Sequence, residues 1–164
     1  MITLRPAVES DNSALGPMGA ALMRQHHTAD PRRFLLTDKP EAGYGRFLIS
    51  QLADADTLVM VAEDAGEVVG YVFASIEGTS WRDLRGPCGF IHDVYVLEGV
   101  RQKGAGRLLA RAAIEWIHSR GMSQVVLWRM TENKAAQALF GSFGFRQTMT
   151  EMTLDQDGAS PQPR

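Results

Sequence analysis

The sequence predicts one α/β domain, and three observations carry that prediction. The chain has 164 residues, 45% of them hydrophobic, which suits a single core and is too little for two. Two valine-rich runs flank the turn signal Asp64-Ala65-Gly66, which predicts a β-hairpin. A strongly amphipathic stretch at 104–120 lies between further apolar runs. We therefore expect one domain at residues 1–154 and a disordered tail at 155–164.

The first half of the chain is expected to hold three strands and two helices. Pro6 ends a short first strand, and Leu15, Met18 and Leu22 repeat at helical spacing after a cap at Ser10 or Asp11. Gly16, Pro17 and Gly19 predict a kink or a break in that first helix. The expected elements are a strand at 2–5, helices at about 11–25 and 41–53, and paired strands at 57–63 and 67–76.

The second half is expected to hold three strands and two helices. Residues 90–97 are apolar on both faces, which predicts a central strand. The clearest helix, 104–120, has its apolar stripe at Leu108, Leu109, Ala112, Ala113, Trp116 and Ile117. Gly121 and Gly144 are typical helix ends. The remaining elements are a strand at 124–128 with Trp128 in the core, a helix at 133–143 and a last strand at 145–154.

Composition argues against several classes of function. There are 17 Lys and Arg against 19 Asp and Glu, so we expect no nucleic-acid partner, which would need clustered positive charge. No apolar run approaches the roughly 20 residues that span a bilayer, so we expect no membrane partner. The lone Cys88 excludes an internal disulfide, and the start of the chain lacks a signal-peptide pattern. With neither a membrane-spanning run nor a signal-peptide pattern, the expected location is the cytoplasm. His26 and His27 lack a third ligand at metal-site spacing, so we expect no metal.

The segment from Arg101 to Arg107 carries the strongest chemical signal. It joins the central strand to the amphipathic helix, and Gly104-Ala105-Gly106 permits a tight turn. Free N–H groups of a first helical turn favour a bound anion, and three basic side chains add positive charge. From these residues alone, an anion site and a glycine-softened connection both stay open. The Rossmann and Walker patterns are absent.

Two longer segments resemble one family. Val100–Leu109 resembles motif A of the GNAT acetyltransferase superfamily, Arg/Gln-x-x-Gly-x-Gly/Ala, with a strand before it and a helix after it. Asn133–Phe140 with Phe143–Phe145 is similar to the Asn-x-x-Ala-x-x-Leu-Tyr…Leu-Gly-Phe segment, and Leu4–Ala7 fits a typical start. The resemblance covers residues 1–154. It implies the GNAT fold, a central mixed, mostly antiparallel twisted sheet of six to seven strands flanked by about four helices.

The resemblance also implies acetyl-CoA as co-substrate, an amine acceptor as partner, and a homodimer, since family members are often dimers. In GNATs a splayed strand pairs its backbone with the pantetheine arm, and the turn after it takes the pyrophosphate. Asn133 then hydrogen-bonds near the pantetheine or thioester end. The implied cofactor-binding residues here are Val94, Val96, Arg101, Gln102, Lys103, Gly104, Ala105, Gly106, Arg107, Asn133 and Phe140.

For the base, Ile91–Val96 is similar to the Glu-Asp-x-Tyr/Phe-Val segment of small-amine GNATs, including the spermidine/spermine and thialysine acetyltransferases. Their acidic base position falls on His92, whose imidazole, with an ordinary pKa of about 6.5, suits removal of an amine proton. A half-buried structural histidine is the other interpretation. Asp93 is the next candidate, and strand alternation predicts that it points away from His92. The Val94 N–H is expected to serve the oxyanion.

One position departs from the family pattern. Phe140 stands where the family has a general-acid tyrosine, and it cannot protonate a thiolate. Thiolate is nonetheless a tolerable leaving group, and water or Tyr95 could substitute. We therefore expect an N-acetyltransferase in which a primary amine of a small molecule or peptide attacks acetyl-CoA directly in a ternary complex. The alternative is a non-catalytic acyl-CoA sensor with the same fold.

Overall fold

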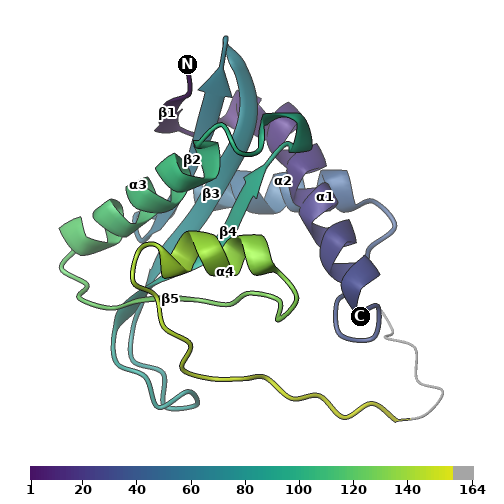
Figure 1. Cartoon of the computed structure of the whole chain (residues 1–164). Coiled ribbons are helices and arrows are strands. Elements are labelled where there is room, and N and C mark those ends of the chain that lie inside the picture. Colours follow the sequence, from purple (N-terminus) through teal and green to yellow (C-terminus); the bar gives the residue numbers. More distant parts are fainter. Residues whose placement is uncertain (157–164) are drawn as a thin grey trace.

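Five strands lie side by side in chain order in a computed structural model that describes residues 1–156. Most of the predicted tail, 157–164, lies outside the described residues. Neighbouring strands are antiparallel from the first to the fourth, and the fifth is parallel to the fourth, so the sheet is mixed and mostly antiparallel as expected. The strands are β1 (Thr3–Pro6), β2 (Thr57–Asp64), β3 (Glu67–Glu77), β4 (Cys88–Val96) and β5 (Val125–Leu127) (Figure 1).

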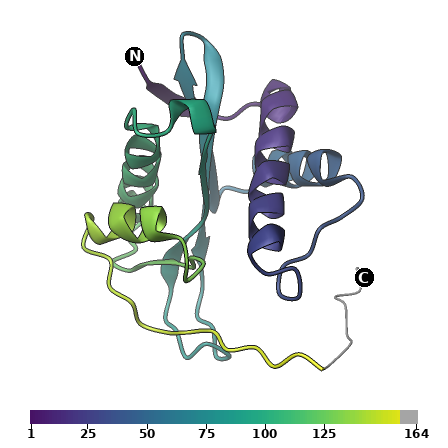
Figure 2. The ribbon, with the colours of Figure 1, turned by 45° about the vertical axis from the view of Figure 1, so that its right-hand side comes forward.

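Helices cover both faces of this sheet (Figure 2). They are α1 (Asn12–Ala29), α2 (Pro40–Gln51), α3 (Ala105–Ser119) and α4 (Lys134–Gly141), with short 3₁₀ turns η1 (Glu9–Asp11) and η2 (Glu98–Val100). Apolar side chains of α3 and α4, such as Leu109 and Phe140, pack on Ile91 and Val72 of the sheet. Leu15 and Leu48 of α1 and α2 pack on Tyr71 of the opposite face. β4 therefore lies between two separate hydrophobic clusters.

Local sequence signals place most of the elements correctly. Ala65 and Gly66 have φ of 54° and 86°, the backbone that a tight hairpin turn between β2 and β3 requires. Gly121 has φ of 80° directly after α3, as a helix-ending glycine should. Both features could be predicted from the sequence, because the backbone of a turn depends on the residues within it.

The first helix is continuous, so the expected split does not occur. Its glycines serve close packing against α2. A Cβ at Gly16 would lie 2.7 Å from the Glu41 carbonyl oxygen, and one at Gly19 would lie 2.1 Å from Cδ1 of Tyr44. Spacing along one helix does not show that a second helix will press against it.

The predicted last strand at 145–154 is wrong: residues 145–156 have no regular structure and are mostly exposed. The β5 strand is three residues long and offers little edge for pairing. The segment is held instead by ion pairs from Arg33 to Glu151 and from Arg32 to Asp155. The sheet of residues 1–156 thus has five strands, rather than six to seven.

Trp128 also lies outside the core, with 75% of its surface exposed. Because β5 ends at Leu127, Trp128 has already left the sheet. Its ring makes an edge-to-face contact with Phe90 of β4, with centroids 5.4 Å apart. The expectation of a core tryptophan is therefore wrong, and an aromatic surface lies beside the start of β4.

Candidate active site

The sheet opens where β4 leaves β5. Their parallel pairing runs from Gly89 opposite Val125 to Ile91 opposite Leu127 and stops there. Residues 92–96 of β4 remain paired with β3 on the other side. Along this stretch, within residues 1–156, no strand covers the edge that faces β5.

The backbone at this open edge belongs to two of the predicted cofactor-binding residues. The Leu97 N–H donates to the Val69 carbonyl of β3 at 2.9 Å. Successive strand residues direct their backbone groups to opposite edges, so Val96 and Val94 present N–H and C=O to the open edge. The Arg101 side chain reaches the Val96 carbonyl there, at 3.0 Å from Nε. A ligand with amide groups would find strand-like partners at Val94 and Val96.

The turn before α3 gathers unpaired backbone donors. Gly104, with φ of 90°, is the N-cap residue of α3 and provides no capping side chain. The first hydrogen bond of the helix runs from the Leu108 N–H to the Gly104 carbonyl at 3.0 Å. The N–H groups of Ala105, Gly106 and Arg107 precede it and have no helical acceptor. With the helix dipole they favour an anion at this spot.

Basic residues flank this turn, and two of them are held in place. The Arg107 guanidinium donates to Ser142 Oγ at 2.8 Å and lies 4.9 Å from the Phe143 ring. Arg101 lies over the Tyr95 ring at 5.7 Å. Gln102 has φ of 70°, an uncommon backbone for a residue with a side chain, and Lys103 is exposed. Positive charge therefore surrounds the free N–H groups.

Asn133 and Phe140 have clear structural roles in α4. Asn133 Oδ1 accepts the Ala136 N–H at 3.0 Å and so caps the helix, which leaves the side-chain amide to donate elsewhere. Phe140 is 8% exposed and packs against Phe145 at 5.4 Å between ring centroids. A core position explains why an apolar ring is accommodated there.

A bulge in β4 changes which residues share a face. Phe73 pairs with Asp93 and Ala74 pairs with Ile91, so His92 is the extra residue between two pairs. The bulge turns His92 and Asp93 to the same side of the sheet, toward α1 and α2. The expectation that they point in opposite directions is therefore wrong, because it assumed unbroken alternation.

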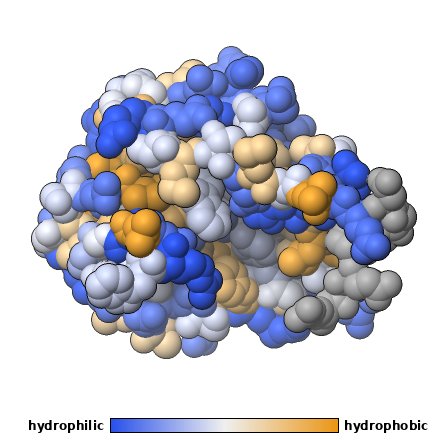
Figure 3. Space-filling view, turned by 90° about the horizontal axis from the view of Figure 1, so that it is seen from below, coloured by the Kyte–Doolittle hydropathy of each residue, from blue (hydrophilic) through white to orange (hydrophobic). Residues whose placement is uncertain are grey.

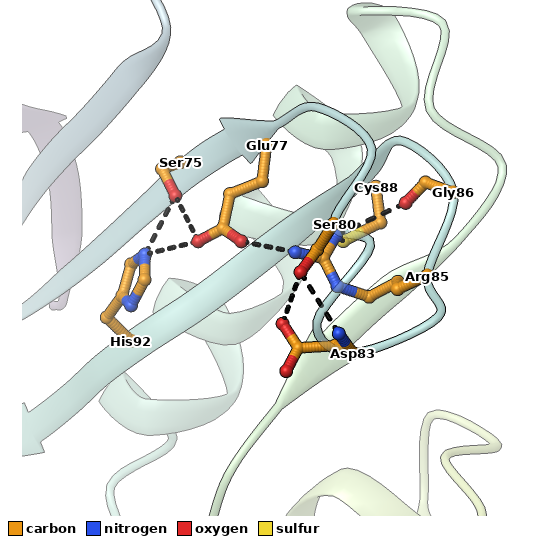
Figure 4. Close-up of polar contacts among 8 residues, drawn as sticks. All are labelled: Ser75, Glu77, Ser80, Asp83, Arg85, Gly86, Cys88 and His92. Carbon is orange, nitrogen blue, oxygen red and sulfur yellow. Dashed lines mark hydrogen bonds and ion pairs between the residues drawn. The ribbon is translucent and has the colours of Figure 1, made fainter.

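The His92 ring is partly covered by aromatic neighbours, with 31% of its side chain exposed. It stacks on Phe73 and on Phe90, each with its centroid 4.7 Å away. Its Nε2 lies 2.7 Å from Ser75 Oγ and 3.6 Å from Glu77 Oε1 (Figure 4). Burial lowers the pKa of His92, although Glu77 and Asp93 act to raise it. The imidazole is therefore neutral at neutral pH, which a base must be.

Asp93 is committed to two tyrosines. Its Oδ2 accepts the hydroxyl of Tyr44 at 2.7 Å and that of Tyr71 at 3.1 Å. Burial raises the pKa of the carboxyl and also that of the Tyr44 hydroxyl, which the adjacent Asp93 raises further. This cluster ties α2 to β3 and β4 directly beside His92.

Tyr95, two residues further along β4, lines a surface pocket of about 340 Å³. Four residues of α1 together with Glu98 and Arg101 complete the lining. The pocket lies on the α1 side of β4, beside the turn that precedes α3. Seen from below, the molecule is hollowed near its middle, with hydrophobic residues on both sides (Figure 3).

Sequence reasoning missed the partners of these residues. Ser75, Glu77 and Tyr71 alternate along β3 and so share a face, but no local signal shows that His92 and Asp93 lie opposite them. That pairing depends on the bulge and on the register of two strands. Tyr44 lies on α2 and donates to Asp93, but the position of α2 depends on how the helices pack, which the local sequence does not show.

Other candidate sites have plain structural explanations. His26 Nδ1 lies 2.9 Å from the Leu22 carbonyl, and His27 Nδ1 lies 2.7 Å from that of Phe34. Among residues 1–156, no group of three or more His, Cys, Asp or Glu side chains is arranged to hold a metal ion. In the same range, no helix combines the length and apolar character needed to cross a membrane.

Comparisons with known proteins agree on one family. The sequence model of the acetyltransferase (GNAT) family matches residues 21–145. An uncharacterised N-acetyltransferase of Bacillus subtilis is 24% identical over 148 residues, which cover 89% of this chain and 91% of the relative. Mycothiol acetyltransferase of Thermobispora bispora is 37% identical over 99 residues, which cover 58% of this chain and only 30% of that protein.

A solved structure shows the same fold. The enzyme AAC(6')-Iy, in complex with the bisubstrate analogue CoA-S-monomethyl-acetylneamine, has a TM-score of 0.73 and 19% identity to this chain. The match covers 95% of this chain and 98% of that one. At this identity the likeness supports the fold alone.

Proposed function

The chain belongs to the GNAT acetyltransferase family, and from that premise we propose that it transfers the acetyl group of acetyl-CoA to a primary amine. The acceptor is a small molecule or a peptide, and it attacks directly in a ternary complex. One observation carries the proposal: His92, a neutral imidazole, is the first β4 residue beyond the paired stretch of β4 and β5. A base therefore stands where the open edge begins.

The residues around the open edge fit acetyl-CoA. Of the N–H groups from Gln102 to Arg107, those of Ala105, Gly106 and Arg107 are suited to the pyrophosphate, because they precede the first helical hydrogen bond and lie at the positive end of α3. The Lys103 N–H instead donates to the Val100 carbonyl at 3.4 Å. Val94 and Val96 offer strand-like partners to the amide groups of pantetheine. The Asn133 amide is free to donate while its oxygen caps α4. Bound there, acetyl-CoA supplies an activated acetyl thioester.

His92 removes the proton that acylation of an amine releases. An alkylammonium has an ordinary pKa of about 10, so a base must take a proton at neutral pH. His92 can hold that proton because Glu77 lies 3.6 Å from Nε2 and the Asp93 carboxyl is adjacent on the chain. Asp93, bound to two tyrosines, supports the imidazolium electrostatically.

Two other positions assist the reaction. The Val94 N–H at the open edge is available to the carbonyl oxygen of the thioester, where charge develops. Tyr95 lines the pocket on the α1 side, where it can contact the acceptor. No general acid is required at Phe140 to protonate the leaving group. A thiol has an ordinary pKa of about 8.5, so its thiolate leaves readily near neutral pH.

Phe140 also favours a second candidate function, an acyl-CoA sensor without turnover. Its ring is part of the α3–α4 core, and the position offers no hydroxyl to the leaving thiolate. Such a sensor would bind acetyl-CoA at the same open edge. Turnover alone distinguishes it from the enzyme.

A thiol-release screen tests the proposed function. The protein is incubated with acetyl-CoA and, in turn, polyamines, amino acids, aminoglycosides and peptides with free N-termini. The released CoA thiol is measured, and product masses are determined by mass spectrometry. We expect release of CoA with at least one amine, and a product heavier by one acetyl group. Calorimetric binding of acetyl-CoA without turnover on the whole panel would instead support the sensor. No binding of acetyl-CoA at all would overturn both functions.

A further inference from the structure

We propose that Ser75, Glu77 and Arg85 are positioning residues that keep the proton of neutral His92 on Nε2, so that Nδ1 is the atom that accepts the proton of the amine. The inference rests on the proposed role of His92 as the base. It adds the atom that acts and the residues that select it.

The three residues reach His92 in a chain of polar contacts (Figure 4). Ser75 and Glu77 alternate on one face of β3, and the β4 bulge turns His92 toward that face. Ser75 Oγ lies 2.7 Å from His92 Nε2 and 3.4 Å from Glu77 Oε1. Glu77 Oε1 lies 3.6 Å from the same Nε2. One ring nitrogen therefore faces both the hydroxyl and the carboxylate.

That arrangement selects one tautomer. A carboxylate is only an acceptor, so it repels a bare lone pair on Nε2 and attracts an N–H there. With the proton on Nε2, the ring donates to Ser75 Oγ, and the Ser75 hydroxyl donates to Glu77 Oε1. Nδ1 then carries the lone pair, on the side of the ring away from Ser75 and Glu77 (Figure 4).

The geometry of the ring sets how a proton reaches this nitrogen. Phe73 and Phe90 stack on the imidazole, and a proton reaches Nδ1 in the plane of the ring, where its lone pair lies. When the amine is acylated, its N–H bond breaks and an Nδ1–H bond forms. The resulting imidazolium keeps its Nε2–H toward Ser75 and Glu77. Because 31% of the side chain is exposed, the proton then passes to solvent.

Arg85 sets how strongly Glu77 acts on the ring. Its Nη2 lies 2.6 Å from Glu77 Oε2, so the carboxylate is shared between a permanent cation and the imidazole. Reciprocal backbone hydrogen bonds of 2.8 Å and 3.0 Å between Ser80 and Arg85 fix the loop that carries the guanidinium. Arg85 thus limits the pull of Glu77 on the ring, and His92 stays neutral.

Within residues 1–156, two charged groups act directly on His92. Glu77 faces it from β3, Asp93 adjoins it on β4, and Arg85 acts from the loop through Glu77. His26 of α1 lowers the pKa of Asp93, so it affects His92 only through Asp93. Removing Glu77 should lower the pKa of His92, whereas removing Arg85 should free Glu77 and raise it. Opposite signs from two linked residues are the signature of this arrangement.

Nitrogen NMR of the histidine rings tests the proposal on the full chain without ligand. We expect the Nε2–H tautomer in the unsubstituted protein, a lower His92 pKa in Glu77→Gln and a higher one in Arg85→Met. Arg82→Met removes an exposed arginine from the same loop and should leave the titration unchanged. An Nδ1–H tautomer, or shifts of the same sign in both variants, would overturn the proposal.

Two further readouts keep the test decisive. If Arg85→Met does not fold, Ser75→Ala should mix the two tautomers, and an unchanged tautomer there contradicts the chain of contacts. On an accepted amine, Ser75→Ala should lower kcat about tenfold, as loss of one hydrogen bond to a charged group predicts, with KM for acetyl-CoA unchanged. Should no amine be acetylated, the proposed function fails while the NMR result still decides the tautomer.

Discussion

At the scale of single residues, Asp11 shows how one carboxylate joins the first strand to the first helix. It occupies the N-cap position of α1, one of the two positions that the sequence predicts, yet its side chain does not cap that helix. Its oxygens accept hydrogen bonds from Arg5 Nη1 at 2.7 Å, from Arg5 Nη2 at 2.9 Å and from the Val8 N–H at 2.8 Å. The hydrogen bonds from Arg5 hold the pKa of Asp11 below its usual range.

Asp11→Asn should therefore destabilise the protein in a pH-dependent way. A lowered folded-state pKa means that the stabilisation is present above the unfolded pKa of about 3.9 and is lost as pH falls through the folded value. We expect a loss of about 2 kcal/mol at pH 7, typical of hydrogen bonds to a charged group, and a smaller loss at pH 3, below the unfolded pKa. Urea unfolding at both pH values measures it. An equal loss at pH 3 would contradict the charged interaction.

At the scale of elements, the contact between α1 and α2 places Tyr44 beside the site. The absence of a side chain at Gly19 leaves room for the Tyr44 ring, and the hydroxyl of that ring reaches Asp93 next to His92. The glycines of α1 are thus a packing feature that also positions a group near the proposed base. Their effect on helix propensity alone would suggest a weaker helix.

Gly19→Ala and Gly43→Ala form a matched pair that isolates this packing. Both glycines lie within helices, but a Cβ at Gly43 would meet nothing within 4 Å. We expect Gly19→Ala to destabilise by about 1–3 kcal/mol through overpacking, and Gly43→Ala to be neutral or to stabilise by up to about 1 kcal/mol. Thermal unfolding of both variants measures this. Similar effects of the two substitutions would show that helix propensity dominates.

Elements also mark the limit of prediction from sequence. The hairpin turn at Ala65 and Gly66 and the end of α3 at Gly121 were predictable because they depend on local backbone conformation. The bulge at His92 was not, because it exists only relative to the register of β3. The prediction of a strand at 145–154 is wrong for a similar reason: a strand needs an edge to pair with, and that edge is not part of the local sequence.

At the scale of the whole molecule, β4 separates the two halves of the proposed reaction. Its open edge and the turn before α3 present the groups suited to acetyl-CoA. Its α1–α2 face carries His92, Asp93 and Tyr95, and Tyr95 lines a pocket there. The family and the cofactor turn could be predicted from contiguous motifs. The polar network around His92 could not, because it joins β3, β4 and the loop between them in space.

The central claim is that His92 takes the amine proton, and its substitution tests that claim most directly. On an accepted amine, we expect His92→Ala to lower kcat at least about 100-fold, with KM for acetyl-CoA little changed. The acid limb of the rate profile, expected below pH 6.5 because burial lowers the pKa of His92, should disappear. His118→Ala, at an exposed position on α3, should behave like the unsubstituted enzyme. Full activity of His92→Ala from pH 5 to 9 would contradict the account.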